Sequence, residues 1–286
     1  MATRLLRQYY EPVSTVIPDE VVAPEPWARH RHRMRDTLRA LPDAEWHAAT
    51  RCTDWDVKDV VSHLVTVDQY WVFAFNAART DDPPTTFLEH FDPSSGTDTQ
   101  VASLREVSSA EVAERFANGT DALVQLVETF APADWDAIGE SPLGHLPARL
   151  LFGHAFWDSW LHERDMFVPI GRAPSVEPDE LLAVTCFCLL FAGLQGGLVD
   201  DARATGDALS DPVESTLRFD ELPDAGVRVV YDTGVRVELV DPASASDAGS
   251  AVALVEGFTG RQPLAVADGR LPQEFAAHLA RASHVL

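Results

Sequence analysis

The chain has 286 residues, of which 46% are hydrophobic and 23% charged, and a formal net charge of −23. This composition is that of a globular protein and excludes disordered, collagen-like and coiled-coil classes for most of the chain. The length suits two domains, and so acidic a chain is not expected to bind nucleic acid or anionic lipid through its overall charge. Lys58 is the single lysine among 22 basic residues, a bias typical of the high-GC genomes of actinobacteria.

Residues 1–26 contain four prolines and no hydrophobic periodicity, so they are predicted to form an irregular N-terminal arm. The first ten residues lack the apolar segment of a signal peptide. The most apolar run, residues 181–199, includes Thr185 and Gln195, and we interpret it as a buried bundle helix and not as a membrane span. These features predict a cytoplasmic protein.

Five helices are predicted from apolar residues that recur at spacings of three and four. They cover residues 27–41, 55–79, 109–130, 147–168 and 179–204. Asp54 is expected to cap the second helix, and Ser108 forms a capping box with Glu111 at the third. The segments 80–107 and 132–146 are predicted to be loops.

From Asp207 onward the pattern changes to a period of two, which is typical of strands. Strands are predicted over residues 213–219, 227–231, 235–240 and 251–258, with a hairpin turn at 232–234 and a final helix over 272–282. The chain is therefore expected to comprise the arm of residues 1–26, a helical bundle over 27–206 and a small α+β domain over 207–286.

Three cysteines are too few for a disulfide framework. Cys186 and Cys188 lie in an apolar helix and are interpreted as small buried hydrophobic residues. Cys52 is assigned no role.

A basic cluster lies in the first predicted helix. It consists of Arg29, His30, Arg31, His32, Arg33 and Arg35. We interpret it as a solvated helix face, with attraction of an anionic cofactor as the alternative.

Ionisable residues form a stripe on the helix predicted over 147–168. His154, Asp158, His162 and Asp165 follow one another at spacings of four, four and three, which places them on one face. Their neighbours are mostly aromatic and aliphatic, so this helix is expected to be buried and its charges to need partners or a metal.

A metal ion can be held by two side chains one helical turn apart together with a third from another helix. Asp158 and His162 form such a pair, and His63 would complete a set of two imidazoles and one carboxylate. His154 and His162 are about 12 Å apart along the helix axis and are not expected to share an ion. Two alternatives need no metal, namely a structural core histidine at 63 and an ion pair between Asp158 and His162.

Two segments resemble motifs of the mycothiol-dependent maleylpyruvate isomerase-like family, which belongs to the DinB-like four-helix bundle superfamily. The first, from Trp46 to Leu64, ends in D-W-D-V-K-D-V-V-S-H-L, whose histidine is His63. The second, A-F-W-D-S-W-L-H-E-R-D over residues 155–165, is similar to the family's R-x-x-E-x-x-x-H-x-x-D.

The second segment matches at His162 and Asp165 but has Ala155 for the usual arginine and Asp158 for the usual glutamate. Aspartate is one methylene shorter than glutamate. The ion would therefore lie closer to the helix, or bind Asp158 through water, or have His154 as its ligand in place of Asp158.

The resemblance implies a mainly α fold, with a DinB-like four-helix bundle followed by a small α+β C-terminal domain. It also implies a divalent metal, usually Zn²⁺, bound by His63, Asp158 and His162. Mycothiol is the implied thiol cosubstrate, because a metal lowers the pKa of a coordinated thiol.

The resemblance further suggests catalytic roles for residues around the metal. Asp165 would orient His162, unless it pairs with Arg164 or Arg172. Arg261, in the segment G-F-T-G-R, is the candidate for a catalytic and cofactor-binding arginine. His154 is a further catalytic candidate, as a general acid or base.

The expected function is isomerisation or S-transfer on a small electrophilic metabolite. The thiolate would add to a conjugated alkene and leave after bond rotation, or stay on the product. The alternatives are a non-catalytic binding protein, and an enzyme that uses His154, Asp158 and His162 for cyclisation or dehydration without a thiol. The expected partner is a small-molecule substrate, with no nucleic acid or membrane, for a monomer or homodimer.

Overall fold

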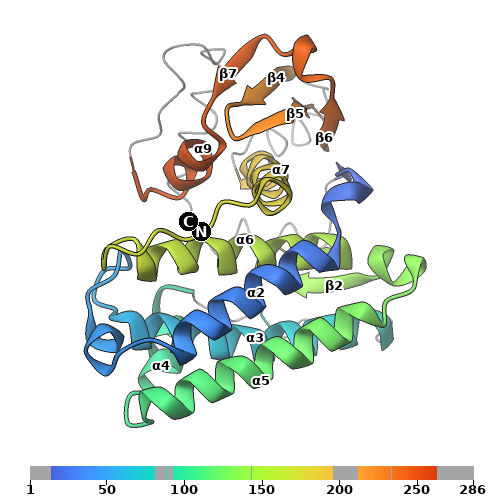
Figure 1. The fold of residues 1–286 in the computed structure, drawn as a ribbon. Helices are drawn as coiled ribbons and strands as arrows, with labels where there is room; N and C mark the ends of the chain where they lie inside the picture. The colour runs from blue at the N-terminus through green and yellow to red at the C-terminus, as the bar shows by residue number, and fades with distance from the viewer. Residues whose placement is uncertain are drawn as a thin grey trace. The chain divides into compact units, whose positions relative to one another are not determined.

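A computed structural model describes residues 14–80, 88, 93–142, 144–195, 212–232 and 234–262. These residues divide into two compact units (Figure 1). Residues 24–175 form a helical unit, and residues 14–23 together with 176–262 form a sheet unit. The prediction of a mainly α fold with a small α+β part is confirmed.

Four long helices build the helical unit and pack side by side (Figure 1). They are α2 (Pro24–Arg39), α3 (Val57–Thr80), α5 (Ser109–Glu128) and α6 (Ala148–Phe167). A shorter helix, α4 (Pro93–Ala102), packs on α3. Each long helix begins close to the residue that the hydrophobic periodicity predicted, so the four-helix bundle follows from the apolar pattern.

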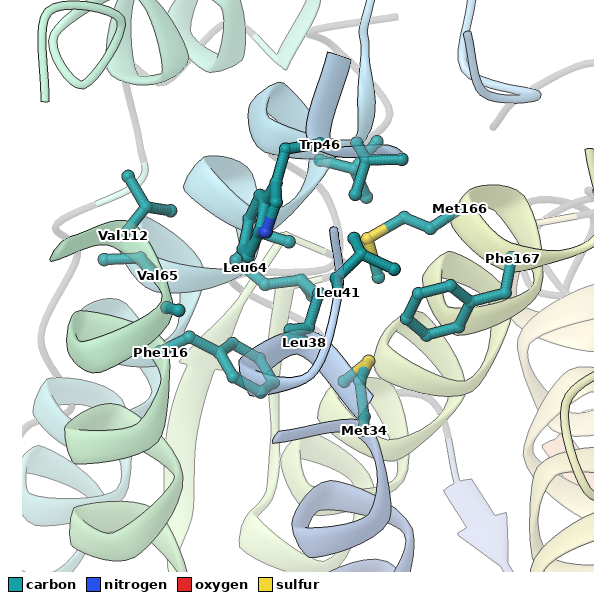
Figure 2. Close-up of a cluster of buried hydrophobic side chains, with 14 of the residues drawn as sticks. Met34, Leu38, Leu41, Trp46, Leu64, Val65, Val112, Phe116, Met166 and Phe167 are labelled. Atoms are coloured by element: carbon teal, nitrogen blue, oxygen red, sulfur yellow. The ribbon is translucent and has the colours of Figure 1, made fainter. Parts of the chain in front are cut away.

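One end of the bundle is closed by a cluster of buried apolar side chains (Figure 2). Leu38 comes from α2, Leu64 from α3, Phe116 from α5 and Met166 from α6, and Trp46 is contributed by the short helix η2 (Asp43–His47). Burial of each such side chain stabilises the fold by about 1.5–3 kcal/mol. This cluster therefore holds α3 and α6 together close to the ionisable residues that both helices carry.

The two predicted helix caps have different outcomes. At α5 the Ser108 side chain accepts a hydrogen bond from the Glu111 backbone N–H at 3.2 Å, as expected. The Asp54 cap was wrong, because Asp54 adopts a positive φ of 69° and α3 begins at Val57. Asp56 takes the capping role, and its Oδ1 accepts the N–H of Asp59 at 2.8 Å.

Both segments predicted as loops contain regular structure. The first includes α4, and the second includes the short helix η3 (Pro132–Asp136) and the hairpin of β2 (Ile138–Ser141) and β3 (Gly144–Pro147). These elements are short and receive their order from packing on α3 and α6. Their own sequences carry too few apolar repeats to signal it.

The described residues of the sheet unit form a sheet of five strands in the order β1-β6-β5-β4-β7. The strands are β1 (Ser14–Val16), β4 (Val213–Phe219), β5 (Leu222–Tyr231), β6 (Gly234–Val240) and β7 (Asp247–Gly249). β1 pairs in parallel with β6, so the arm predicted to be irregular supplies an edge strand. This unit also contains the short helices η1 (Asp19–Val21) and η4 (Pro242–Ser244).

The three strands predicted up to residue 240 are confirmed, but residues 251–258 form helix α9 (Ala251–Phe258) and not a strand. The Ser250 side chain caps this helix by accepting the Ala253 N–H at 3.1 Å, and Glu221 accepts the Ala251 N–H at 3.0 Å. An apolar run of eight residues fits either element, so this polar capping decided it. The predicted helix 272–282 and residues 1–13 lie outside the described residues.

Helix α7 (Pro178–Gln195) belongs to the sheet unit, whereas the sequence analysis placed it with the bundle. It packs on β5, β6 and α9. Cys186 and Cys188 are fully buried, as expected, and burial raises the pKa of Cys186 to about 12. Among the described residues, no helix has the length and apolar character that crossing a membrane requires.

Gly193 allows α7 to approach the sheet. A Cβ atom there would lie 2.6 Å from ring carbon Cε1 of Tyr231 and 2.6 Å from Cγ2 of Val235. Gly193→Ala should therefore lower the free energy of unfolding by about 1–3 kcal/mol, as other overpacking substitutions do. Urea denaturation measures this loss, and adding Val235→Ala should recover part of it. Equal stability of Gly193→Ala and the wild type would contradict this packing.

Candidate metal centre

The structure brings together the three residues expected to bind a metal. His63 projects from α3, and Asp158 and His162 project one turn apart from α6. Nε2 of His63 lies 3.9 Å from Oδ2 of Asp158, and Nε2 of His162 lies 3.4 Å from Oδ1 of Asp158. The two imidazole rings are 5.0 Å apart between centroids and nearly perpendicular.

These distances suit a zinc ion. Zinc lies about 2.0–2.1 Å from nitrogen and carboxylate ligands in tetrahedral sites, which puts the ligand atoms about 3.3–3.4 Å from one another. The three candidate ligand atoms lie within 4.8 Å of one another. Two imidazoles and one carboxylate leave at least one coordination position open, the arrangement found in catalytic zinc sites. The shorter Asp158 side chain directs one carboxylate oxygen toward each imidazole, Oδ2 toward His63 and Oδ1 toward His162.

Asp165 holds the far side of the His162 ring. Its Oδ2 lies 3.0 Å from Nδ1 of His162, and the carboxylate is fully buried. Such a carboxylate fixes the orientation of a metal-binding imidazole and directs Nε2 toward the ion. The expectation that Asp165 contacts His162 agrees with this geometry.

Without a metal, the centre is an ion pair. Burial disfavours a charged His162, but the Asp158 and Asp165 carboxylates outweigh it and raise the pKa of His162 well above its usual range. Burial also disfavours a charged Asp158, but His162 and His63 hold the pKa of that carboxyl well below its usual range. The metal-free centre therefore carries a proton that an arriving cation must displace.

Zinc binding should consequently release about one proton per ion at pH 7, from His162, because Asp158 is already ionised. The apparent affinity should rise with pH for the same reason. Calorimetry in buffers of different ionisation enthalpy measures the proton count. Asp165→Asn removes one group that raises the pKa of His162 and should reduce the release. Identical heats in all buffers would contradict a protonated His162.

His154 lies one turn before Asp158, outside this set of ligands. Its Nδ1 is 3.4 Å from Oγ of Ser141 in β2, and its ring contacts Trp71 at 5.2 Å and Trp157 at 5.9 Å between centroids. Burial lowers the pKa of His154 to about 4, although the Asp158 carboxylate opposes this shift. Burial therefore keeps His154 neutral at physiological pH and also makes it a weaker base than an exposed imidazole.

Arg261 belongs to the sheet unit, directly after α9. Its Nη1 donates a hydrogen bond to the Thr259 carbonyl at 3.1 Å, and its backbone N–H donates to the Glu256 carbonyl at 2.9 Å. Its catalytic and cofactor-binding role stays a prediction.

Cys52, which was assigned no role from the sequence, lies beside His162 and Asp165. Its Sγ is 3.7 Å from Nδ1 of His162 and 3.4 Å from Oδ2 of Asp165. His162 and Asp165 follow Cys52 by 110 and 113 positions in the chain, so no local spacing signalled the contact.

The interpretation of the basic cluster on α2 as a solvated face was wrong for His30 and Arg31, which are buried. Nη1 of Arg31 donates to Oγ of Ser159 at 3.2 Å, and its Nη2 pairs with Asp68. His30 contacts Oγ of Ser159 at 3.0 Å and pairs with Glu163. The α6 partners, Ser159 and Glu163, each directly follow a candidate metal ligand, so this network also fixes the position of α6.

Residues 27–167 match the family model described as the mycothiol maleylpyruvate isomerase N-terminal domain. The helical unit of the chain therefore carries a domain of that family. The match spans α2 to α6 and so includes His63, Asp158 and His162.

Two solved structures share the fold of the chain. They are crystal structures of the mycothiol-dependent maleylpyruvate isomerase and of a mutant of it in which one histidine is replaced by alanine. Each has 13% sequence identity and a TM-score of 0.55, over 86% of this chain and 90% of the other. No curated protein matches the chain.

Proposed function

We propose that this protein is a metal- and mycothiol-dependent enzyme, an isomerase or S-transferase, that acts on a small electrophilic metabolite. The convergence of His63, Asp158 and His162 carries the proposal, because these atoms suit a divalent ion with an open position. The family match supports mycothiol as the thiol, and the solved structures of similar fold carry the name of a mycothiol-dependent isomerase.

The residues of the chain have distinct tasks in this proposal. His63, Asp158 and His162 would hold a divalent ion, most simply Zn²⁺. Such an ion, when bound, supplies positive charge that lowers the pKa of a coordinated thiol. Asp165 keeps the His162 ring oriented through the contact at Nδ1.

His154 is positioned to handle a proton. It is neutral because burial lowers its pKa to about 4, and it lies on the same stripe of α6 as Asp158. A neutral imidazole with a lowered pKa would serve as a hydrogen-bond partner or as a weak general base for a reacting group. Arg261 is retained as a candidate for binding an anionic group of the thiol or the substrate.

Thermal shifts test the proposal. Metal-free protein and zinc-loaded protein should be compared with mycothiol and with S-methyl mycothiol, which has no free thiol. We expect mycothiol to raise the melting temperature of the zinc-loaded protein further, and to leave that of the metal-free protein unchanged. A shift that needs no metal, or that S-methyl mycothiol also produces, would favour a binding protein over a thiol-dependent enzyme.

A further inference from the structure

His162 presents a second set of donor atoms on the opposite side of its ring. Its Nε2 faces Asp158, whereas its Nδ1 faces Oδ2 of Asp165 at 3.0 Å and Sγ of Cys52 at 3.7 Å. The Cys52 sulfur and the Asp165 oxygen are 3.4 Å apart. One sulfur, one nitrogen and one oxygen thus converge within 4.8 Å of one another.

The backbone places Cys52 at this position. The Arg51 N–H donates to the carbonyl of Asp165 at 3.1 Å, which ties the segment before α3 to the end of α6. The hydroxyl of Thr50 accepts the Cys52 N–H at 3.1 Å and donates to the Trp55 carbonyl at 2.8 Å. These hydrogen bonds hold the backbone at Cys52 in place, so the fold itself positions the thiol beside His162.

We propose that Cys52, Nδ1 of His162 and Asp165 form a second metal site, for a thiophilic divalent cation such as cadmium or excess zinc. A tetrahedral zinc ion with a Zn–S bond of about 2.3 Å and Zn–N and Zn–O bonds of about 2.0–2.1 Å places sulfur about 3.6 Å from its neighbours and nitrogen about 3.3 Å from oxygen. The observed separations are 3.7, 3.4 and 3.0 Å. A soft thiolate selects thiophilic cations over magnesium and calcium.

Occupation of this site changes the contact between His162 and Asp165. The cation takes the place of the hydrogen on the Cys52 sulfur and of the hydrogen on Nδ1, and both protons pass to solvent. Asp165 then binds the cation and no longer accepts a hydrogen bond from His162. The second site is therefore inhibitory toward the centre of His63, Asp158 and His162; this consequence, unlike the site itself, rests on the proposed function.

Cadmium titration of the metal-free protein tests the site, because cadmium–thiolate bonds absorb in the near ultraviolet. His63→Ala removes a ligand of the first set and leaves the second set intact. Cys52→Ser removes the sulfur and keeps a hydrogen-bonding group beside Asp165. We expect the thiolate band in the wild type and in His63→Ala, and its complete loss in Cys52→Ser.

Cys188→Ala is the control for thiol background. Cys186 and Cys188 are both fully buried, and burial raises both of their pKa values, so neither should add to the band. The proposal is overturned if wild type and His63→Ala show no thiolate band, or if the band survives in Cys52→Ser.

The failure of the two proposals can be distinguished. If the first centre binds no zinc, Cys52→Ser protein binds no zinc either, yet the cadmium band of the wild type remains. If the second site does not exist, Cys52→Ser protein binds zinc as the wild type does and no variant shows the band.

Discussion

Replacing His63 by alanine should reduce zinc affinity by more than about 100-fold. Loss of a residue that only orients a metal ligand typically costs about 10- to 100-fold, and loss of a ligand itself should cost more. His63 is the only candidate ligand from α3 within the group of His63, Asp158 and His162 in the described residues, and its Nε2 faces the Asp158 carboxylate at 3.9 Å. Without it, the ion would depend on two ligands from one helix. Competition with a zinc-binding dye measures the affinity, and zinc content after purification provides an independent check.

Asp165→Asn provides the graded comparison. The Asp165 carboxylate contacts Nδ1 of His162 and is not itself a ligand of the first centre. Its loss should therefore lower zinc affinity by about 10- to 100-fold. His32→Ala is the matched control, because His32 lies partly exposed on α2 and pairs with Asp121 at 3.9 Å. Equal zinc affinity of the wild type and His63→Ala would show that the three residues form only an ion-paired cluster.

Replacing Arg31 by methionine should lower the free energy of unfolding by about 3–5 kcal/mol, because it leaves a buried carboxylate without its counterion. Arg31 pairs with Asp68 from α3, donates to Thr120 of α5 at 3.1 Å and lies over the ring of Phe116 at 4.3 Å. Asp68 is buried, and Gly119 leaves room for its carboxylate, since a Cβ there would lie 2.9 Å from Oδ2. Urea denaturation at pH 8 measures the loss.

The loss should depend on pH in a defined direction. Burial raises the pKa of Asp68 to about 6, against the opposing charge of Arg31, so removing Arg31 raises that pKa further. In the folded variant Asp68 then keeps its proton at pH values where Asp68 of the unfolded chain, which titrates at about pH 4, has lost it. The free energy of unfolding of the variant therefore falls as the pH rises from about 4 to the raised pKa of Asp68. The cost of Arg31→Met should therefore be smaller at pH 5 than at pH 8.

Arg31→Met with Asp68→Asn removes the buried charge and should recover much of the loss at pH 8. Arg35→Met is the surface control, because Arg35 pairs with the exposed Asp36 and Asp121 and should cost less than about 1 kcal/mol. A loss of the same size at both Arg31 and Arg35 would contradict a special role for the buried pair.

The part of the fold that was predictable from sequence had strong periodicity. The stripe of Val57, Val60 and Leu64 predicted α3, and the alternation in 213–219 predicted β4 with the same bounds as observed. Elements set by distant packing or by polar caps were missed, such as the β2–β3 hairpin and helix α9. A run of eight residues carries too little pattern to choose between a strand and a helix.

In the candidate site, too, local patterns predicted some residues and only the tertiary structure revealed others. The spacing of Asp158 and His162 on one helix predicted their pairing, and the motif that contains His63 predicted the third member. Only the tertiary structure placed Cys52 beside His162, because the two are 110 residues apart.

By itself the sequence therefore determined the five long helices, the three central strands and the candidate ligands of the first centre, since each of these depends on periodicity or on a local motif. The tertiary structure alone decided that Arg31 is buried and not solvated, that residues 14–16 form an edge strand, and which atoms face the two nitrogens of His162. Burial, strand pairing across the chain and side-chain convergence depend on elements that are distant in sequence, so no local pattern encodes them.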